Sequence, residues 1–452
     1  MERLVGSLPP DSRLPSYRVL QQRYRLSPAT VQRLLATLAR RGLVVTRPGS
    51  GTYTAAARRR SAGAPDVSWQ TLAVGTRGGL GPELERLVEP SPADALPLAS
   101  GFLDATLQPL GLLAAAASRA GRRPQGWSRL PSQGLPELRS HFATETGTAM
   151  TARDVLITPG GQAALSAVFR HLCAPGDPVV VESPTYVGAL AAARAAGLIL
   201  IPVPCDKEGV LPDALADALA RTGARLAYLQ PRYTNPTGAV LASQRRGAVL
   251  AAVASCGAFV IEDDWVRDLD LGQPSPPPLV TMDDDGHVIY LRSLTKPVAA
   301  GLRVAGLAAR GPVLARLRRG RISDDLFVAP VLQQVALDVL TAAGWHRHLG
   351  TVRRVLRERR DTLAAAVRAL LPGCDLAALP GGGLHLWLRL PDRCSDAGVA
   401  EACAARGLAV SPGRSCFAGE PPGSYLRLSY GAADAGALAR GAEILAGVLG
   451  AA

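Results

Sequence analysis

The segment "LRSLTKPVAAGLR", residues 291–303, follows a predicted buried strand and contains Lys296. The chain has 452 residues with 50 lysines and arginines in total, yet Lys296 and Lys207 are its two lysines. A primary amine has an accessible neutral form and can act as a nucleophile, whereas a guanidinium stays protonated. Lys296 is therefore a candidate for amine chemistry. Lys207 lies in the charged turn "CDKEGV" without comparable neighbours, and we assign it no role.

On both sides of this segment, short β-branched stretches alternate with alanine- and leucine-rich helical stretches such as residues 162–173. This alternation is typical of a mostly parallel sheet covered by helices on both faces, so the expected fold class is α/β. In such sheets, ligands bind beyond the carboxyl ends of the strands. The predicted strands, from about residue 155 onward, are "DVLIT", "DPVVVE", "LILIPV", "RLAYLQ", "AFVIED", "HVIYL" and "VAGLAA".

Residues that packing does not explain stand at the ends of several of these strands. Tyr186 follows "VVVESP", Asn235 lies in "TNPTG", and Asp263 closes "FVIED". Gly161 and Gln162 follow "VLIT" and open a helix, whose free N–H groups and positive dipole end suit a phosphate. We expect all of them to converge with the lysine in one crevice.

An amine, a carboxylate, an aromatic ring and a phosphate cradle together match the requirements of pyridoxal 5'-phosphate. The amine forms a Schiff base with the aldehyde, the carboxylate keeps the pyridine nitrogen protonated, and the aromatic ring stacks on the pyridine. Ser293, Thr295 and Arg303 offer hydroxyls and a bidentate cation to the phosphate. The alternative is structural: Asp263 and Asp264 form a solvated pair at a strand end, Arg427 is a surface cation on an edge strand, and the lysine is an ordinary surface amine.

The first 60 residues carry twelve arginines against Glu2 and Asp11, which is most of the net charge of +13. A basic surplus confined to one short block indicates a polyanionic partner. Within the block, "LPSYRVLQQRY" and "SPATVQRLLATLARRG" predict two helices with Ser16 and Ser27 as N-caps and Gly42 as a stop. The following "LVVTRPGSGTYTA" predicts a β-hairpin. Val31, Leu34, Leu35 and Leu38 form the predicted apolar stripe of the second helix.

The run "LPPDSRLPSYRVLQQRY…SPATVQRLLATLARRGLVV…RPGSGTY" resembles the winged helix-turn-helix domain of the GntR family of transcription regulators, over residues 1–55. That family usually has a complete helix before this run, whereas here residues 1–6 stand in its place, which predicts a weaker core. The alternative is a helical adaptor with solvated arginines. The resemblance implies that the residues facing DNA are Arg18, Ser27, Ala29, Thr30, Gln32 and Gly51.

After a proline- and alanine-rich linker at 56–95, residues 96–452 resemble fold-type I aminotransferases. The motifs are "LPSQGLPELR", "TPGGQAAL", "ESPTY", "NPTG", "IEDDW", "SLTK…GLR" and "SYLRLSY", and the whole chain is similar to the MocR subfamily of regulators. The resemblance implies a large cofactor part at about 140–330 and a small part at about 335–452. It assigns Lys296 to covalent attachment of the cofactor, Asp263 to the pyridine nitrogen and Asn235 to the ring hydroxyl. It also implies that Tyr186 stacks on the cofactor ring and that Arg427 binds a substrate carboxylate. The residues implied to bind the phosphate are Gly161, Gln162, Ser293, Thr295 and Arg303.

Three positions depart from the pattern of those relatives. Trp265 stands where the subfamily usually has a tyrosine, so a second hydrogen bond to the ring hydroxyl is expected to be absent. Arg129 replaces a tyrosine that reaches the phosphate from the neighbouring subunit. Gly188 replaces a second arginine for carboxylates, which disfavours a dicarboxylate-like or ω-amino acid effector.

Taken together, the sequence predicts a cytoplasmic DNA-binding regulator that senses pyridoxal phosphate, or an amine or amino acid effector, as a homodimer on an operator. The alternatives are a working aminotransferase with a vestigial head, and simple storage of the cofactor. No metal site is expected, because the seven cysteines form no C-x-x-C pair and His346 and His348 point to different helix faces. No membrane segment is expected, since the longest apolar run, residues 247–261, is too short.

Overall fold

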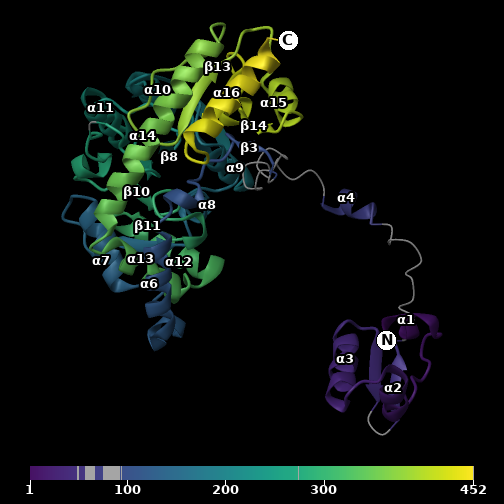
Figure 1. Cartoon of the computed structure of the whole chain (residues 1–452). Helices are drawn as coiled ribbons and strands as arrows, with labels where there is room; N and C mark the ends of the chain where they lie inside the picture. Colours follow the sequence, from purple (N-terminus) through teal and green to yellow (C-terminus); the bar gives the residue numbers. More distant parts are fainter. Residues whose placement is uncertain (48–49, 56–66, 75–91, 93, 273, 451–452) are drawn as a thin grey trace. The chain divides into compact units, whose positions relative to one another are not determined.

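A computed structural model of the chain describes residues 1–47, 50–55, 67–74, 92, 94–272 and 274–450. The chain divides into two compact units, residues Met1–Arg77 and Gly78–Ala452 (Figure 1). Most of the predicted linker at 56–95 lies outside the described residues. Its described part includes one short helix, α4 (Trp69–Val74).

The first unit contains two helices and a hairpin in the order that the sequence predicts, preceded by a six-residue helix. Ser27 caps α3 through a hydrogen bond that its side chain accepts from the N–H of Thr30 at 3.3 Å. Gly42 follows the helix with a φ of +67°, a conformation that glycine adopts without strain. The elements are α1 (Glu2–Ser7), α2 (Tyr17–Tyr24), α3 (Pro28–Arg40), β1 (Val44–Arg47) and β2 (Gly51–Thr54), with β1 and β2 antiparallel.

A small apolar core holds this unit together. It combines Val5 of α1 with Leu14, Leu38 and Val44, so the short first helix does contribute to the packing. The prediction that Leu34 belongs to the buried stripe of α3 is wrong, because its side chain is 37% exposed. On a helix with 3.6 residues per turn, Leu34 and Leu35 lie on opposite sides of the line through Val31 and Leu38. Leu35 packs against the core, whereas Leu34 lies on the more exposed side.

The second unit is built on an eight-stranded sheet with the order β4-β11-β10-β9-β8-β5-β6-β7. Strands β10, β9, β8, β5 and β6 run parallel, while β11 is antiparallel to both of its neighbours and β7 to β6. All seven predicted strands are present, and β7 was not predicted. The strands are β4 (Val155–Thr158), β5 (Pro178–Ser183), β6 (Ile199–Asp206), β7 (Gly209–Val210), β8 (Leu226–Leu229), β9 (Phe259–Asp264), β10 (Val288–Ser293) and β11 (Ala305–Ala308).

Helices cover both faces of this sheet. Along β5, Val180 packs in one hydrophobic cluster, while Val179 and Val181 pack in the other, because successive side chains point to opposite faces. The first cluster includes α6 (Leu110–Arg122), α7 (Pro136–Glu145), α10 (Pro212–Thr222), α11 (Ser243–Ser255) and α13 (Pro330–Leu340). The second includes α8 (Gly161–Leu172), α9 (Val187–Ala195) and α12 (Pro312–Asp325).

The C-terminal part has its own antiparallel sheet, with the order β12-β13-β16-β15, and a third hydrophobic cluster. The long helix α14 (Trp345–Leu370) belongs to both parts: Trp345 and Leu349 pack in the large part, whereas Val352 to Val367 pack in the small one. Helices α14 and α16 lie side by side (Figure 1). The remaining elements are α15 (Asp396–Ala404), α16 (Ala435–Leu449), β12 (Asp375–Leu376), β13 (His385–Arg389), β15 (Ser411–Pro412) and β16 (Tyr425–Ser429).

An N-terminal segment of the second unit joins this C-terminal part. β3 (Leu96–Pro97) pairs in parallel with β14 (Leu408–Ala409), and Leu98, Leu103 and Leu107 pack in the third cluster. This packing brings residues 99–102 to the junction of the two parts. Short 3-10 helices are η1 (Ala105–Leu107), η2 (Pro124–Trp127), η3 (Ala152–Asp154), η4 (Leu279–Met282), η5 (Ala300–Leu302) and η6 (Arg414–Cys416).

Two kinds of feature are absent from the described ranges. None of the helices there is both long enough and apolar enough to cross a bilayer. Nor do those ranges contain a group of three or more histidine, cysteine, aspartate or glutamate side chains that can hold a metal ion.

Candidate functional site

The predicted cofactor residues converge on one cavity of about 140 Å³ at the carboxyl ends of the central strands. Loops after β5, β8, β9 and β10 and the start of α8 supply its large-part wall, while β13 and β16 supply its small-part wall. Every residue that the sequence assigned to the cofactor or substrate lines it: Gly161, Gln162, Tyr186, Asn235, Asp263, Ser293, Thr295, Lys296, Arg303 and Arg427.

Lys296 extends its amine into this cavity. The Nζ atom lies 3.6 Å from the centroid of the Phe102 ring. Loss of hydration lowers the pKa of Lys296 to about 7, and the positive charges of Arg427 and Arg303 act in the same direction. A large fraction of the amine is therefore neutral at neutral pH, which is the form that attacks a carbonyl.

Asp263 presents its carboxylate from the end of β9 and is 4% exposed. Its Oδ2 atom accepts hydrogen bonds from the Tyr228 hydroxyl at 2.7 Å and from Nε2 of Gln230 at 3.0 Å. Burial raises the pKa of Asp263 to about 6, although these hydrogen bonds oppose the shift. Because both hydrogen bonds end on Oδ2, the Oδ1 atom remains available to a positively charged group in the cavity. The alternative of a solvated surface pair is wrong, since Asp264 is 2% exposed.

The beginning of α8 forms an anion cradle. Gly160 has a φ of +91°, and a Cβ atom there would lie 2.6 Å from the guanidinium of Arg303. Arg303 itself has a φ of +50° and donates to Oγ1 of Thr295 at 3.3 Å. A helix N-terminus, a guanidinium and the nearby Ser293 and Thr295 hydroxyls are donors that suit a phosphate dianion.

Tyr186 is held in the wall of the cavity by contacts with α8 and α9. Its hydroxyl donates to Oε1 of Gln162 at 3.1 Å, and Nε2 of Gln162 donates to the carbonyl of Gly188 at 2.7 Å. Burial raises the pKa of Tyr186 to about 12, so the hydroxyl stays a donor. A Cβ atom at Gly188 would lie 2.3 Å from Cζ of Tyr186, so a side chain at this position would collide with the Tyr186 ring.

We expect Gly188→Ala to displace the Tyr186 ring and to weaken cofactor binding, with a loss of about 1–3 kcal/mol in the free energy of unfolding from overpacking. Equilibrium denaturation and cofactor titration measure the two effects. Gly247→Ala is the matched control, since Gly247 also lies in a helix, α11, and a Cβ atom there meets nothing within 4 Å. The control is expected to gain about 0.5–1 kcal/mol. Equal behaviour of the two variants would contradict the packing argument.

Arg427 occupies a buried position on β16, with 3% of its surface exposed. It donates to Oδ1 of Asn235 at 3.2 Å and to the carbonyl of Ala99 at 2.9 Å. Its Nε atom has no hydrogen-bond partner among the described residues. The geometry leaves a donor for a ligand carboxylate. The alternative of a surface cation on an edge strand is wrong, because β16 lies between β13 and β15.

The three departures from the expected pattern have structural counterparts. The indole Nε1 of Trp265 donates to the carbonyl of Tyr233 at 3.1 Å, so its single N–H is already used. Arg129 is exposed and does not line the cavity within this chain. The cavity also includes residues that the sequence did not single out: Gly101, Phe102, Leu165, Gln230 and His385.

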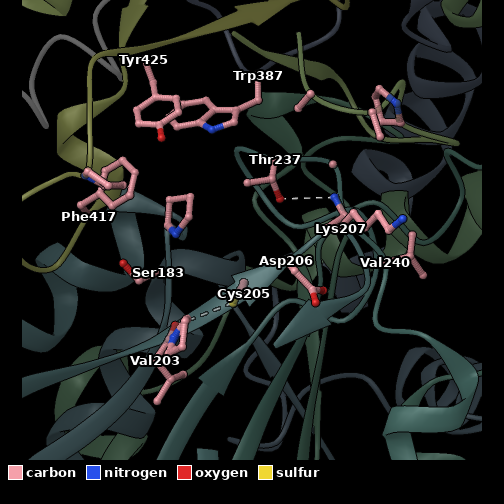
Figure 2. A pocket seen from close by; sticks show the side chains of 18 of the residues that line it. Ser183, Val203, Cys205, Asp206, Lys207, Thr237, Val240, Trp387, Phe417 and Tyr425 are labelled. Atoms are coloured by element: carbon pink, nitrogen blue, oxygen red, sulfur yellow. Dashed lines mark hydrogen bonds between the residues drawn. The ribbon is translucent and has the colours of Figure 1, made fainter. Parts of the chain in front are cut away.

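A second and larger cavity, of about 810 Å³, lies between the two parts of this unit (Figure 2). Lys207, in the turn between β6 and β7, lines it together with Trp387, Phe417 and Tyr425. The rings of Trp387 and Tyr425 stack with centroids 5.0 Å apart. Lys207 therefore borders a cavity, but a different one from the cavity lined by the carboxylate, amine and phosphate cradle described above.

In the first unit, the predicted DNA-facing residues lie on three elements: Arg18 at the start of α2, Gly51 on the hairpin, and the others at the N-cap and first turns of α3. Arg18, Ser27, Ala29 and Gln32 are exposed, while Thr30 and Gly51 are half-buried. The Ser27 and Thr30 hydroxyls lie 2.8 Å apart and complete the cap. Exposed side chains at the start of such a helix are suited to contacts with bases and phosphates.

Residues 94–445 match the aminotransferase class I and II family, and residues 4–54 match the gntR family of bacterial regulatory proteins. The chain is 28% identical over 450 residues to the HTH-type transcriptional regulator YdfD of Bacillus subtilis, covering 96% of this chain and 91% of that protein. It is 34% identical over 318 residues to 2-aminoadipate transaminase of Thermus thermophilus, covering 70% and 79% of the two chains.

The crystal structure of LysN, an alpha-aminoadipate aminotransferase from Thermus thermophilus complexed with N-(5'-phosphopyridoxyl)-L-leucine, matches with a TM-score of 0.79. That match has 30% sequence identity and covers 84% of this chain and 98% of that one. The predicted fold-type I architecture is thereby confirmed. Aminotransferases of this family depend on pyridoxal phosphate, and the free Oδ1 of Asp263, the amine of Lys296 and the anion cradle fit that group. The chain belongs to the aminotransferase class I and II family and begins with a winged helix-turn-helix domain of the gntR type.

Proposed function

We propose that this protein is a DNA-binding transcription regulator whose aminotransferase domain binds pyridoxal 5'-phosphate and senses it or an amine or amino acid effector. The observation that carries the proposal is the presence, in one chain, of a gntR-type head and a complete set of cofactor residues around a buried lysine. Relatives that match over nearly their whole length are named HTH-type transcriptional regulators. A regulator of this kind acts in the cytoplasm.

Each residue that the sequence assigned to the cofactor or the effector has a place in this proposal. When bound, pyridoxal phosphate supplies an aldehyde that condenses with primary amines. Lys296 holds it covalently, Asp263 faces its ring nitrogen, and Asn235 donates to its ring hydroxyl. Arg427 receives the carboxylate of an effector. The ring of Tyr186 stacks on the cofactor, and its phosphate is bound by Gly161, Gln162, Ser293, Thr295 and Arg303.

Regulation requires that the ligand prefer one arrangement of the protein over another. We propose a homodimer in which an effector shifts the spacing of two winged-helix heads, which read repeated half-sites of an operator. The arginine-rich composition of the head supports contacts with phosphates. Arg18, Ser27, Ala29, Thr30, Gln32 and Gly51 are the proposed contact residues on double-stranded DNA.

We expect Arg18→Ala to weaken binding to all DNA sequences about 5- to 10-fold and to reduce the salt dependence of the binding constant by about one ion, because one phosphate contact is lost. Gln32→Ala should cost about 1–3 kcal/mol on the operator alone, since base contacts carry the specificity. Fluorescence anisotropy with the intergenic DNA next to the protein's own gene and with random DNA measures both.

The control for these variants is Arg40→Ala, which removes an exposed arginine at the opposite end of α3. It should leave operator binding within about twofold of the wild type. A loss for Arg40→Ala as large as for Arg18→Ala would mean that the head attracts DNA through its net charge and not through the proposed face.

The second candidate function is that of a working aminotransferase with a head that no longer regulates. The buried and correctly placed Arg427 and the relatedness to 2-aminoadipate transaminase favour it. The two functions differ in turnover and in DNA retention. Sustained conversion of amino acids and oxo acids without salt-sensitive binding to the operator identifies an enzyme, whereas cofactor-dependent operator binding identifies a regulator.

A further inference from the structure

His385 is the one residue of the cofactor cavity with two buried polar atoms that lack a partner among the described residues. It lies on β13 and is 3% exposed. Both ring nitrogens, Nδ1 and Nε2, are without a hydrogen bond in the part of the chain that the structure describes. A buried polar atom without a partner destabilises the folded state, so packing alone does not explain a histidine at this position.

The position of the ring shows what it faces. Its plane stacks on Trp265 with centroids 5.6 Å apart and an interplanar angle of 9°. A Cβ atom placed on Gly101 would lie 3.8 Å from Nε2 of His385 and 3.7 Å from Nζ of Lys296. The Nε2 atom of His385 and the amine of Lys296 therefore lie close to the same point next to Gly101, which has no side chain to separate them.

Arg427 supplies the second half of this arrangement. In the sheet, His385 is paired with Ser429 and Trp387 with Arg427, so His385 and Arg427 are diagonal neighbours on one face. The Nη atoms of Arg427 are engaged by Asn235 and by the carbonyl of Ala99, while its Nε atom has no partner among the described residues. Two buried nitrogen donors, one from each strand, are thus free on the same wall.

We propose that His385 and the Nε atom of Arg427 together receive the carboxylate of an α-amino acid, and that His385 makes the site prefer an amino acid over the corresponding amine. This inference rests on the proposed function, because the amino group of the same ligand reacts at the cofactor held by Lys296. A neutral imidazole has one N–H to give to a carboxylate oxygen and one nitrogen to accept an N–H from the ligand or from Lys296. Burial keeps the pKa of His385 well below its usual range, so the ring is neutral. An amine without a carboxylate leaves both donors unsatisfied.

The test compares L-alanine with ethylamine, its decarboxylated counterpart, on cofactor-loaded protein, using the change in visible absorbance to obtain a dissociation constant for each. In His385→Phe, which keeps a ring to stack on Trp265 but has no nitrogen, binding of L-alanine should weaken about tenfold, or about 1.4 kcal/mol, and binding of ethylamine less than twofold. His385→Gln, with one donor and one acceptor, should recover part of the preference.

A second readout needs neither cofactor nor amine. Because His385→Phe removes two unsatisfied buried nitrogens, the melting temperature of the ligand-free protein should rise by about 2 °C. A residue with a purely structural role would instead lower it. His348→Phe is the matched control: His348 also stacks on a tryptophan, Trp345, and has an Nε2 without a partner among the described residues, but it lies outside the cofactor cavity. It should leave the ratio of the two dissociation constants unchanged.

An unchanged ratio in His385→Phe, a wild-type protein that binds both compounds equally or neither, or a fall in melting temperature overturns the inference. The proposed function fails separately, when the wild-type protein does not retain pyridoxal phosphate at all. In that case the melting temperature of ligand-free His385→Phe still shows whether the wild-type imidazole destabilises the folded protein.

Discussion

Lys296→Ala abolishes covalent retention of pyridoxal phosphate. In the wild type, borohydride reduction followed by mass spectrometry should show one pyridoxyl group per chain, and the variant should show none. The amine of Lys296 is the one in the described cavity, and no other side chain there is a primary amine. The visible absorbance of the Schiff base between the cofactor and the lysine should disappear with it. Operator binding by the variant should no longer respond to added cofactor, because the ligand has lost its strongest point of attachment.

The same lysine gives the reaction a pH dependence with a defined sign. Its pKa is lowered to about 7 by burial, and the unprotonated amine is the reactive form. The rate of cofactor capture should therefore rise about tenfold for each pH unit below 7 and level off above that value. A profile that still rises steeply between pH 8 and pH 10 would indicate an ordinary, hydrated lysine.

The composition of the chain provides an unusually clean control. Lys207 is the other lysine in the sequence, and it borders the larger cavity (Figure 2), not the one lined by the cofactor residues. Lys207→Ala should retain the full covalent yield. If Lys207→Ala loses the pyridoxyl group and Lys296→Ala keeps it, the assignment of the site is wrong.

Asp263→Asn is expected to weaken cofactor binding about 10- to 100-fold, or about 1.4–2.8 kcal/mol. The carboxylate is 4% exposed and has one oxygen without a protein donor among the described residues, so we expect it to pair with the positively charged pyridine nitrogen when the cofactor is bound. A neutral amide cannot keep that nitrogen protonated. Equilibrium dialysis gives the affinity, and the visible spectrum of the residual bound cofactor reports the protonation state of its ring.

The pH dependence of this interaction follows from the same carboxylate. Its pKa in the cofactor-free protein is raised to about 6 by burial, so it is ionised above that pH and increasingly neutral below it. Cofactor affinity of the wild type should fall as the pH is lowered from 7 to 5, and Asp263→Asn should show a smaller fall, because only the protonation of Lys296 then contributes to it. A wild-type affinity that does not change across that range would contradict the assignment of Asp263.

Asp264→Asn serves as the neighbouring control. Successive residues of β9 point to opposite faces of the sheet, and Asp264 accepts from the Tyr290 hydroxyl at 2.7 Å and pairs with Arg232 at 3.1 Å. This variant should lower the free energy of unfolding by about 1–3 kcal/mol and leave cofactor affinity within a few-fold of the wild type. Comparison of the two variants therefore distinguishes a carboxylate that contacts the ligand, at position 263, from one that stabilises the fold, at position 264.

The part of the site that the sequence predicted is the part built by parallel strands. Strand ends meet at one edge, so Tyr186, Asn235 and Asp263 could be placed together from their positions in the β/α alternation alone. Gly161, at the start of α8, follows from the same geometry. The positions of Asp263 and Arg427 in the interior also removed the surface interpretations that the sequence had left open.

The wall that the sequence did not predict comes from segments whose approach depends on tertiary packing. Gly101 and Phe102 reach the cavity because β3 pairs with β14, a strand close to the other end of the chain. His385 lies within the apolar stretch "GGGLHLWLRL", where a single histidine between leucines has no local pattern to distinguish a ligand contact from a core residue. Its unpaired nitrogens become visible only once the neighbours of β13 are known.

Helix α14 has a mechanical consequence for any ligand-driven movement. A helix of 26 residues is about 39 Å long, and its two ends are anchored in different hydrophobic clusters. Because one continuous helix packs in the hydrophobic clusters of both parts, the small part cannot rotate relative to the large part through a flexible loop alone. A movement of the small part toward an occupied cavity must therefore either bend α14 or shift its Trp345 end within the large part. A displacement next to the ligand is thereby passed along the helix to the core of the large part.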